Sequence, residues 1–147
     1  MRISAIAILV ALFLWPAAVF GQSPEFMDAY NRVGELYAEG RYQEAIPVAA
    51  GIIELGESEL GPSHPNLAAM LNNLAGLHDA LGHATEAEPL YQRALAIQEN
   101  ALGLEHPDVA TNLENYAALF RATGRSAEAA EMDARAKAIR MKQPKDI

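Results

Sequence analysis

The pattern of apolar and polar residues predicts pairs of helices separated by tight turns. In the middle of the chain, four positions follow the i, i+3, i+4, i+7 spacing of one helix face: Leu71, Leu74, Ala75 and His78. A second stripe with helical spacing runs from Ala87 to Leu102. Gly82 stands between the stripes, and glycine commonly ends a helix because it adopts positive φ without strain. We therefore expect helix, tight turn and helix in this segment.

The helix pair recurs with a period of 42 residues. Three residue types keep this spacing: Gly40, Gly82 and Gly124; Glu44, Glu86 and Glu128; and Ala45, Ala87 and Ala129. The connector LGPSHPNLA, Leu60 to Ala68, returns as LGLEHPDVA, Leu102 to Ala110. One pair alone cannot bury its apolar stripe, so about three stacked units are expected. The sequence supplies three, at about residues 26–56, 66–102 and 108–141.

Three motifs of the middle unit carry a family resemblance. They are Asn-Asn-Leu-Ala at 72–75, Glu-Ala-Glu-Pro-Leu-Tyr at 86–91 and the His-Pro connector at 106–107. The segment from Leu71 to Ala110 closely resembles the tetratricopeptide repeat (TPR) of the kinesin light chain type, although Ala84 stands where an aromatic residue is usual. The resemblance implies an all-α fold, a solenoid of helical hairpins. As a guide to function it is weak, because one fold hosts many partners.

The first 21 residues have a different character from the repeats. After Arg2 the chain has no charged residue until Glu25, and Pro16 interrupts the apolar run. A positive start, an apolar segment and small residues before a cut are typical of a secretory signal peptide. We expect cleavage before Gln22, leaving 22–147 as the TPR domain of an exported protein, periplasmic or secreted. The alternative is an uncleaved anchor, since 18 apolar residues just span a membrane core of about 30 Å.

Composition and motifs argue against several classes of partner, enzyme and metal site. Asp and Glu outnumber Lys and Arg by 19 to 11, a net charge of −8, which argues against nucleic acid as partner. Cysteine is absent, which excludes disulfides and thiol catalysis. No phosphate-binding glycine loop, metalloprotease helix or serine-nucleophile turn occurs, so no enzyme, cofactor or small-molecule substrate is predicted. His64 and His106 lie one repeat apart, about 10 Å by helix spacing, too far to share a metal with bonds of about 2 Å.

Asparagine recurs at one position of all three first helices, at Asn31, Asn73 and Asn115. Its amide competes with the helix backbone, so this repetition asks for a compensating role. The amide both donates and accepts, which matches the main chain of an extended peptide. In the family that the chain resembles, the first helices line a concave groove and asparagines at this site hold peptide main chain. The alternative is that the amides bond carbonyl groups between neighbouring units.

The resemblance places further side chains beside this row. They are Tyr30, Asn72, Tyr37, Asp79 and Arg121, together with Glu114 in the first helix of the third unit. The set lacks the lysines that a clamp for a C-terminal carboxylate needs, so recognition of an acidic terminal motif is not expected. We therefore predict an exported module that binds a peptide or partner protein in the concave groove of a short TPR solenoid. The alternative is a structural or oligomerising module, membrane-anchored if the first segment stays uncleaved.

Overall fold

The computed structural model describes residues 24–144, which form six helices and no strand. The helices are α2 (Pro24–Ala38), α3 (Tyr42–Leu60), α4 (Pro65–Ala80), α5 (Ala84–Leu102), α6 (Pro107–Ala122) and α7 (Ser126–Lys142). The predicted signal segment, 1–21, lies outside the described residues. None of the described helices is both long enough and apolar enough to span a bilayer.

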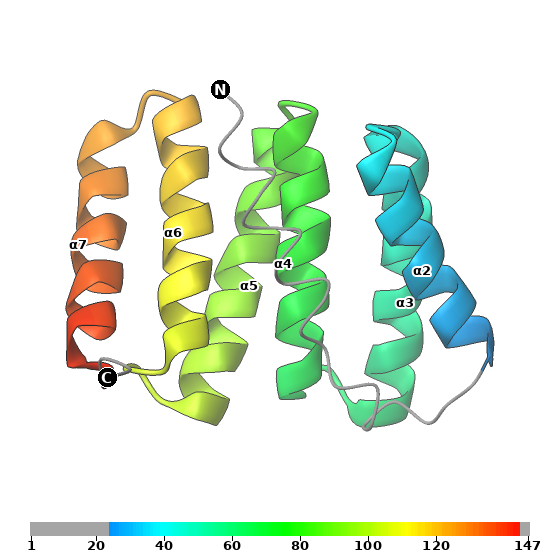
Figure 1. The fold of residues 1–147 in the computed structure, drawn as a ribbon, viewed down its shortest axis with the longest axis horizontal. Coiled ribbons are helices and arrows are strands. Elements are labelled where there is room, and N and C mark those ends of the chain that lie inside the picture. Colours follow the sequence, from blue (N-terminus) through cyan, green and yellow to red (C-terminus); the bar gives the residue numbers. More distant parts are fainter. Residues whose placement is uncertain (1–23, 145–147) are drawn as a thin grey trace.

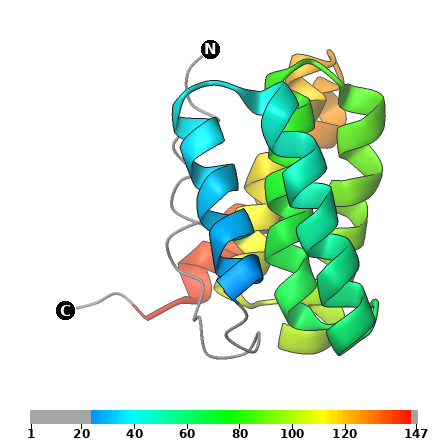
Figure 2. The same ribbon diagram turned by 90° about the vertical axis from the view of Figure 1, so that its right-hand side faces the viewer.

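The six helices form three antiparallel pairs that stand side by side in chain order (Figure 1). Each helix packs against the next one along the chain, and α4 also contacts α6. Turned by 90°, the molecule presents α2 on one side and α3 and α5 on the other (Figure 2). The predicted all-α solenoid of three helical hairpins is therefore confirmed, with α4 and α5 as its central pair.

The turns inside the pairs explain the periodic glycines. Gly40, Gly82 and Gly124 have φ of 73°, 75° and 77°, a region where a side chain would be strained. In the central pair, the backbone N–H of His83 then donates to the carbonyl of His78 at 2.9 Å. The other two turns make the same bond across five residues. This is the Schellman closure of a helix C-terminus, and it reverses the chain within two residues.

The connectors between the pairs explain the repeated LG..HP sequence. Gly61 and Gly103 share the same backbone angles, φ 89° and ψ 158°. His64 then caps α4, because its Nδ1 accepts a hydrogen bond from the backbone N–H of Asn66 at 3.2 Å. His106 caps α6 with the same geometry and distance. The proline after each histidine is the first helical residue, where a missing N–H costs nothing. Because the backbone angles and the cap are the same, both connectors give the following helix the same starting direction.

The buried apolar residues form three clusters, each of which includes residues of two neighbouring pairs, and α4 is the most buried helix. Between Leu67 and Leu77, every residue of α4 except Ala69 is buried. Aromatic rings join the second and third pairs, because Tyr91 of α5 stacks on Tyr116 of α6 with centroids 5.8 Å apart. Within α6, Tyr116 also stacks on Phe120. Such offset stacks contribute stabilisation beyond that from the burial of apolar surface. The central pair thus packs against the first pair through one cluster and against the third pair through the other two.

Candidate functional site

The predicted asparagine row is unevenly buried. Asn31 is exposed on α2, whereas Asn73 on α4 and Asn115 on α6 are 7% and 8% exposed. Within residues 24–144, Asn73 Oδ1 and Asn115 Nδ2 have no hydrogen-bond partner. Buried polar atoms are nearly always paired, and leaving one unpaired costs about 1–3 kcal/mol. At equivalent positions of two helices in contact, one buried acceptor and one buried donor are therefore unpaired within the described residues.

Unpaired buried polar atoms in the described residues concentrate on these two helices. Six of the seven belong to α4 or α6: Asn66 Nδ2, Asn72 Oδ1, Asn73 Oδ1, His78 Nδ1, Asn112 Oδ1 and Asn115 Nδ2. The seventh, Glu99 Oε1, lies 2.5 Å from Arg135 Nη2 in an ion pair that is off the line of a hydrogen bond. The first helices of the second and third pairs thus carry a set of buried polar atoms that have no hydrogen-bond partner in the described chain.

Asn112 belongs to this set of residues with unpaired buried atoms, and the sequence analysis does not predict it. It is 1% exposed on α6, and its Nδ2 donates to Gln98 Oε1 of α5 at 3.2 Å. The equivalent residue of the central unit is Met70, which is also buried. The sequence signal for Asn112 is the amide itself, because the equivalent position one repeat earlier is the apolar Met70. Its bond to Gln98 ties α6 to α5, so Asn112 combines packing with polar character.

The two tyrosines predicted for the groove differ in burial. Tyr37 is 5% exposed and packs against Tyr42, with ring centroids 5.2 Å apart. Burial, with a smaller contribution from Tyr42, raises the pKa of Tyr37 to about 12. Tyr30 is half-buried beside Phe26, and burial raises its pKa as well. Tyr37 is therefore a core residue of the first pair, while Tyr30 keeps part of its surface open.

The predicted charged residues also differ in their contacts. Arg121 of α6 is exposed and forms an ion pair with Asp133 of α7. Glu114, one of the flanking groove candidates, pairs with Arg140 at 3.0 Å. Asp79 is half-buried on α4, and no cation of the described residues pairs with it. Burial raises its pKa above the ordinary aspartate value.

Small residues stand at one further position of the three first helices: Gly34, Gly76 and Ala118. Gly34 has an ordinary helical φ, and a Cβ built on it meets no atom within 4 Å. Glycine inside a helix costs roughly 0.5–1 kcal/mol relative to alanine. Neither backbone strain nor packing of the described residues accounts for this glycine. Asn31 and Tyr30 precede it by three and four residues, so they are its neighbours on the helix surface.

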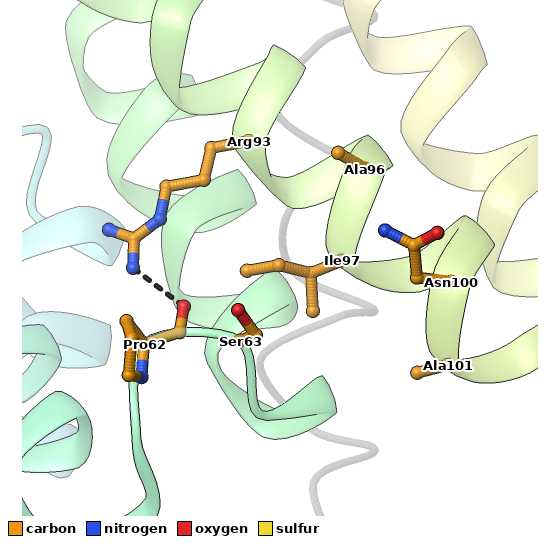
Figure 3. Close-up of a pocket in the computed structure, with 7 residues that line it drawn as sticks. All are labelled: Pro62, Ser63, Arg93, Ala96, Ile97, Asn100 and Ala101. Atoms are coloured by element: carbon orange, nitrogen blue, oxygen red, sulfur yellow. Dashed lines mark hydrogen bonds between the residues drawn. The ribbon is translucent and has the colours of Figure 1, made fainter.

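A cavity of about 380 Å³ opens at the junction of the first and second pairs (Figure 3). Its lining residues are Pro62, Ser63, Arg93, Ala96, Ile97, Asn100 and Ala101. The Arg93 guanidinium donates to Glu57 Oε1 at 2.5 Å and to the Pro62 carbonyl at 2.8 Å. One repeat later, a cavity of about 460 Å³ contains Arg135 at the equivalent place. Since both guanidiniums are held by glutamates of the preceding unit, these cavities are features of the unit junctions.

The histidine and acidic side chains of the described residues are spread over the helices and connectors. Within residues 24–144, no three His, Asp or Glu side chains gather as a metal site requires. The connector histidines cap their helices with Nδ1, which accepts a backbone N–H and is therefore already engaged.

Comparison with known proteins agrees with this architecture. The family model described as "Tetratricopeptide repeat" matches residues 25–100 and 80–142, which together cover most of the chain. The chain belongs to the tetratricopeptide repeat family. TPR proteins are generally non-enzymatic scaffolds, and their repeats typically bind protein partners. A comparison with curated proteins finds no match.

Solved structures with similar TPR arrays include kinesin light chain TPR-like repeats from Podosopora anserina. That structure has 26% identity and a TM-score of 0.74, and the alignment covers 84% of this chain and 59% of that one. A single-substitution variant of the same repeats has 26% identity and a TM-score of 0.72, with 81% and 56% covered. BtubC (BKLC) from P. vanneervenii has 23% identity and a TM-score of 0.72, with 83% and 50% covered. The chain thus spans 50–59% of the length of these structures.

Proposed function

We propose that this protein is an interaction module that holds an extended segment of a partner protein across α4 and α6. The main chain of that segment donates to Asn73 Oδ1 and accepts from Asn115 Nδ2. The observation that supports the proposal is the pair of unpartnered amide atoms on two touching helices, each more than nine-tenths buried. A protein–peptide hydrogen bond at each atom would remove the cost of leaving it unpaired.

The spacing of the two amides sets the register of the bound segment. Neighbouring helices lie about 10 Å apart, and an extended chain rises about 3.3 Å per residue. Residues about three apart in the segment therefore reach Asn73 and Asn115. Main-chain capture of this kind gives affinity, while side-chain contacts give specificity.

The main alternative for the amides is a bond between units of the solenoid itself. An amide that bridges to a neighbouring carbonyl oxygen uses only its Nδ2, as Asn112 does with Gln98 while its own Oδ1 stays unpaired among the described residues. The Nδ2 of Asn115 makes no such bond within the described chain. The unpaired donor of Asn115 therefore favours an external ligand over an internal bridge at that position.

The structural or oligomerising alternative has less support. The junctions repeat one ion pair, Glu57 to Arg93 and Glu99 to Arg135, each at 2.5 Å. At the arginine position of α3 stands Gly51, and at the glutamate position of α7 stands Met141. Two copies that continued the array end to end would therefore lack the ion pair of the internal junctions.

Export is a separate part of the proposal and rests on the apolar segment at residues 1–21 alone. An exported module would meet its partner in the periplasm or outside the cell. Mass spectrometry of the mature protein tests this point: a chain that starts at Gln22 supports cleavage, and a chain that retains Arg2 supports a membrane anchor instead.

A random dodecapeptide library tests the groove even though the partner is unidentified. Peptides selected on the full chain are measured against Asn73→Ala/Asn115→Ala and against Asn100→Ala, an exposed asparagine that lines the junction cavity. We expect the double variant to lose about tenfold or more in affinity, because two main-chain bonds disappear. Asn100→Ala should bind as the native chain does. Equal binding by the double variant, with folding confirmed by circular dichroism, would disprove main-chain capture.

A further inference from the structure

Two adjacent amides on the predicted groove face of α4, Asn72 and Asn73, have acceptor oxygens that are unpaired in the described chain. Asn72 Oδ1 and Asn73 Oδ1 have no hydrogen-bond partner within residues 24–144, and the two side chains are 4% and 7% exposed. Asp79 follows Asn72 by seven residues, two helical turns, so the two lie on one face of α4. Gly76 lies between them on the same face, where it adds no side chain. A ligand that satisfies the oxygens of Asn72 and Asn73 must bring donors, whereas the Nδ2 of Asn66, seven residues before Asn73 and also unpaired in the described chain, requires an acceptor.

Asp79 differs from the other charged candidates because it lacks a cation. The two charged side chains at the groove positions of α6 are already paired with α7: Arg121 with Asp133, and Glu114 with Arg140. No described cation pairs with Asp79, and its charge contributes to raising the pKa of Tyr91 on the adjacent α5. A half-buried carboxylate without a counter-charge is costly, and a pairing cation would repay most of that cost.

A metal ion is a poor candidate for that cation. Calcium takes six or more oxygen ligands, and magnesium requires six in octahedral geometry. The described chain gathers no group of three acidic or histidine side chains. A lysine ammonium or an arginine guanidinium, in contrast, needs one carboxylate and a few acceptors.

We propose that this face of α4 selects partner segments that carry a lysine or arginine, with the cation at Asp79 and main-chain N–H groups at Asn72 and Asn73. The inference rests on the proposed function and adds the chemical class of the partner. Asn72 and Asp79 are about 10 Å apart along the helix axis, which an extended segment covers in about three residues. The basic residue would therefore lie about three residues from the main-chain contacts.

The test uses the random dodecapeptide library with three forms of the full chain. They are the native protein, Asp79→Asn and Asp79→Lys, with Glu131→Gln as the control that removes one exposed acid from α7. The native chain and the control should enrich lysine or arginine at one register position. Asp79→Asn should lose this preference, and Asp79→Lys should enrich aspartate or glutamate there. For one selected peptide, Asp79→Asn should bind about tenfold more weakly, as should the peptide with its basic residue changed to norleucine.

The outcomes separate this inference from the proposed function. Peptides that need Asn73 and Asn115 but show no basic preference would overturn the inference and leave main-chain capture standing. Peptides whose basic residue is needed but whose binding ignores Asp79 would also overturn it. A library that yields no binder, or binders insensitive to both asparagines, would overturn both proposals.

Discussion

Replacing Gly34 with alanine should stabilise the protein and weaken ligand binding together. Gly34 lies inside α2 at a normal helical φ, and an added Cβ would meet no atom within 4 Å. Glycine lowers helix stability by roughly 0.5–1 kcal/mol relative to alanine. With no clash and no special backbone angle to offset this gain, Gly34→Ala should raise the free energy of unfolding by about that amount.

The chain contains a matched control at Gly51, in the middle of α3. A Cβ there also meets nothing within 4 Å, and its φ is likewise ordinary. Gly51→Ala should therefore stabilise the fold by a similar amount. For a domain of this size, 1 kcal/mol corresponds to a rise of roughly 3–6 °C in the unfolding midpoint. Thermal and urea unfolding followed by circular dichroism measure both variants on the same scale.

Binding is expected to separate the two glycines. Gly34 is equivalent to Gly76 and Ala118 on the first helices of the other pairs, whereas Gly51 is on a second helix. If the segment bound across α4 and α6 continues over α2, a methyl group at Gly34 intrudes on it and one at Gly51 does not. Library peptides should then bind Gly34→Ala more weakly and Gly51→Ala normally. Unchanged binding by Gly34→Ala would refute this extension of the segment over α2, and a loss of stability would refute the reasoning on packing.

Four other substitutions test the remaining residues. Asn73→Ala should change the free energy of unfolding by less than about 1 kcal/mol, because Oδ1 has no bond to lose; a loss of about 2 kcal/mol or more would mean that the amide bridges units. His106→Ala should cost about 1 kcal/mol in urea unfolding and His106→Asn much less, unless the cap at 3.2 Å contributes nothing. Glu57→Gln should cost about 0.5 kcal/mol or less, because the ion pair with Arg93 is about one-third exposed on both sides; a double-mutant cycle measures the coupling. Burial raises the folded-state pKa of Asp79, so the stability that its protonated carboxyl contributes at low pH is lost as the pH rises through that pKa. Asp79→Asn should thus be the more stable form at neutral pH, and its advantage should vanish in melts below the ordinary aspartate pKa of 3.8.

The repeat architecture could be predicted because local rules and the period agree. Gly82 sits at a turn that requires positive φ, and the same rule holds one repeat before and after it. The sequence identifies the His-Pro connector as a repeated element, but it does not predict that the histidine caps the helix that follows. Histidine is an unusual capping residue, and only the coordinates show Nδ1 of His64 and His106 accepting the backbone N–H two residues on.

The candidate site was less accessible to sequence reasoning. The period places Asn31, Asn73 and Asn115 at one helical position, but it does not give their burial, which depends on the packing of neighbouring helices. The period also places Asp79 and Arg121 at one equivalent position. In the structure, however, Arg121 forms an ion pair with Asp133, and Asp79 has no such partner among the described residues. Contacts between side chains far apart in sequence decide which polar groups stay unpaired, and a repeat pattern does not encode them.

The distribution of unpaired groups indicates where a partner would gain most. An internal junction joins two units with an ion pair and apolar contacts, and Gly51 and Met141 lack the charges to repeat that ion pair at the ends of the array. The unpaired buried amides of the described chain, in contrast, lie on α4 and α6. Each costs about 1–3 kcal/mol, a large share of the roughly 5–15 kcal/mol that stabilises a typical domain. A ligand that bonds Asn73 and Asn115 therefore recovers free energy that contact at the ends does not offer, and it should raise the unfolding midpoint as its concentration increases.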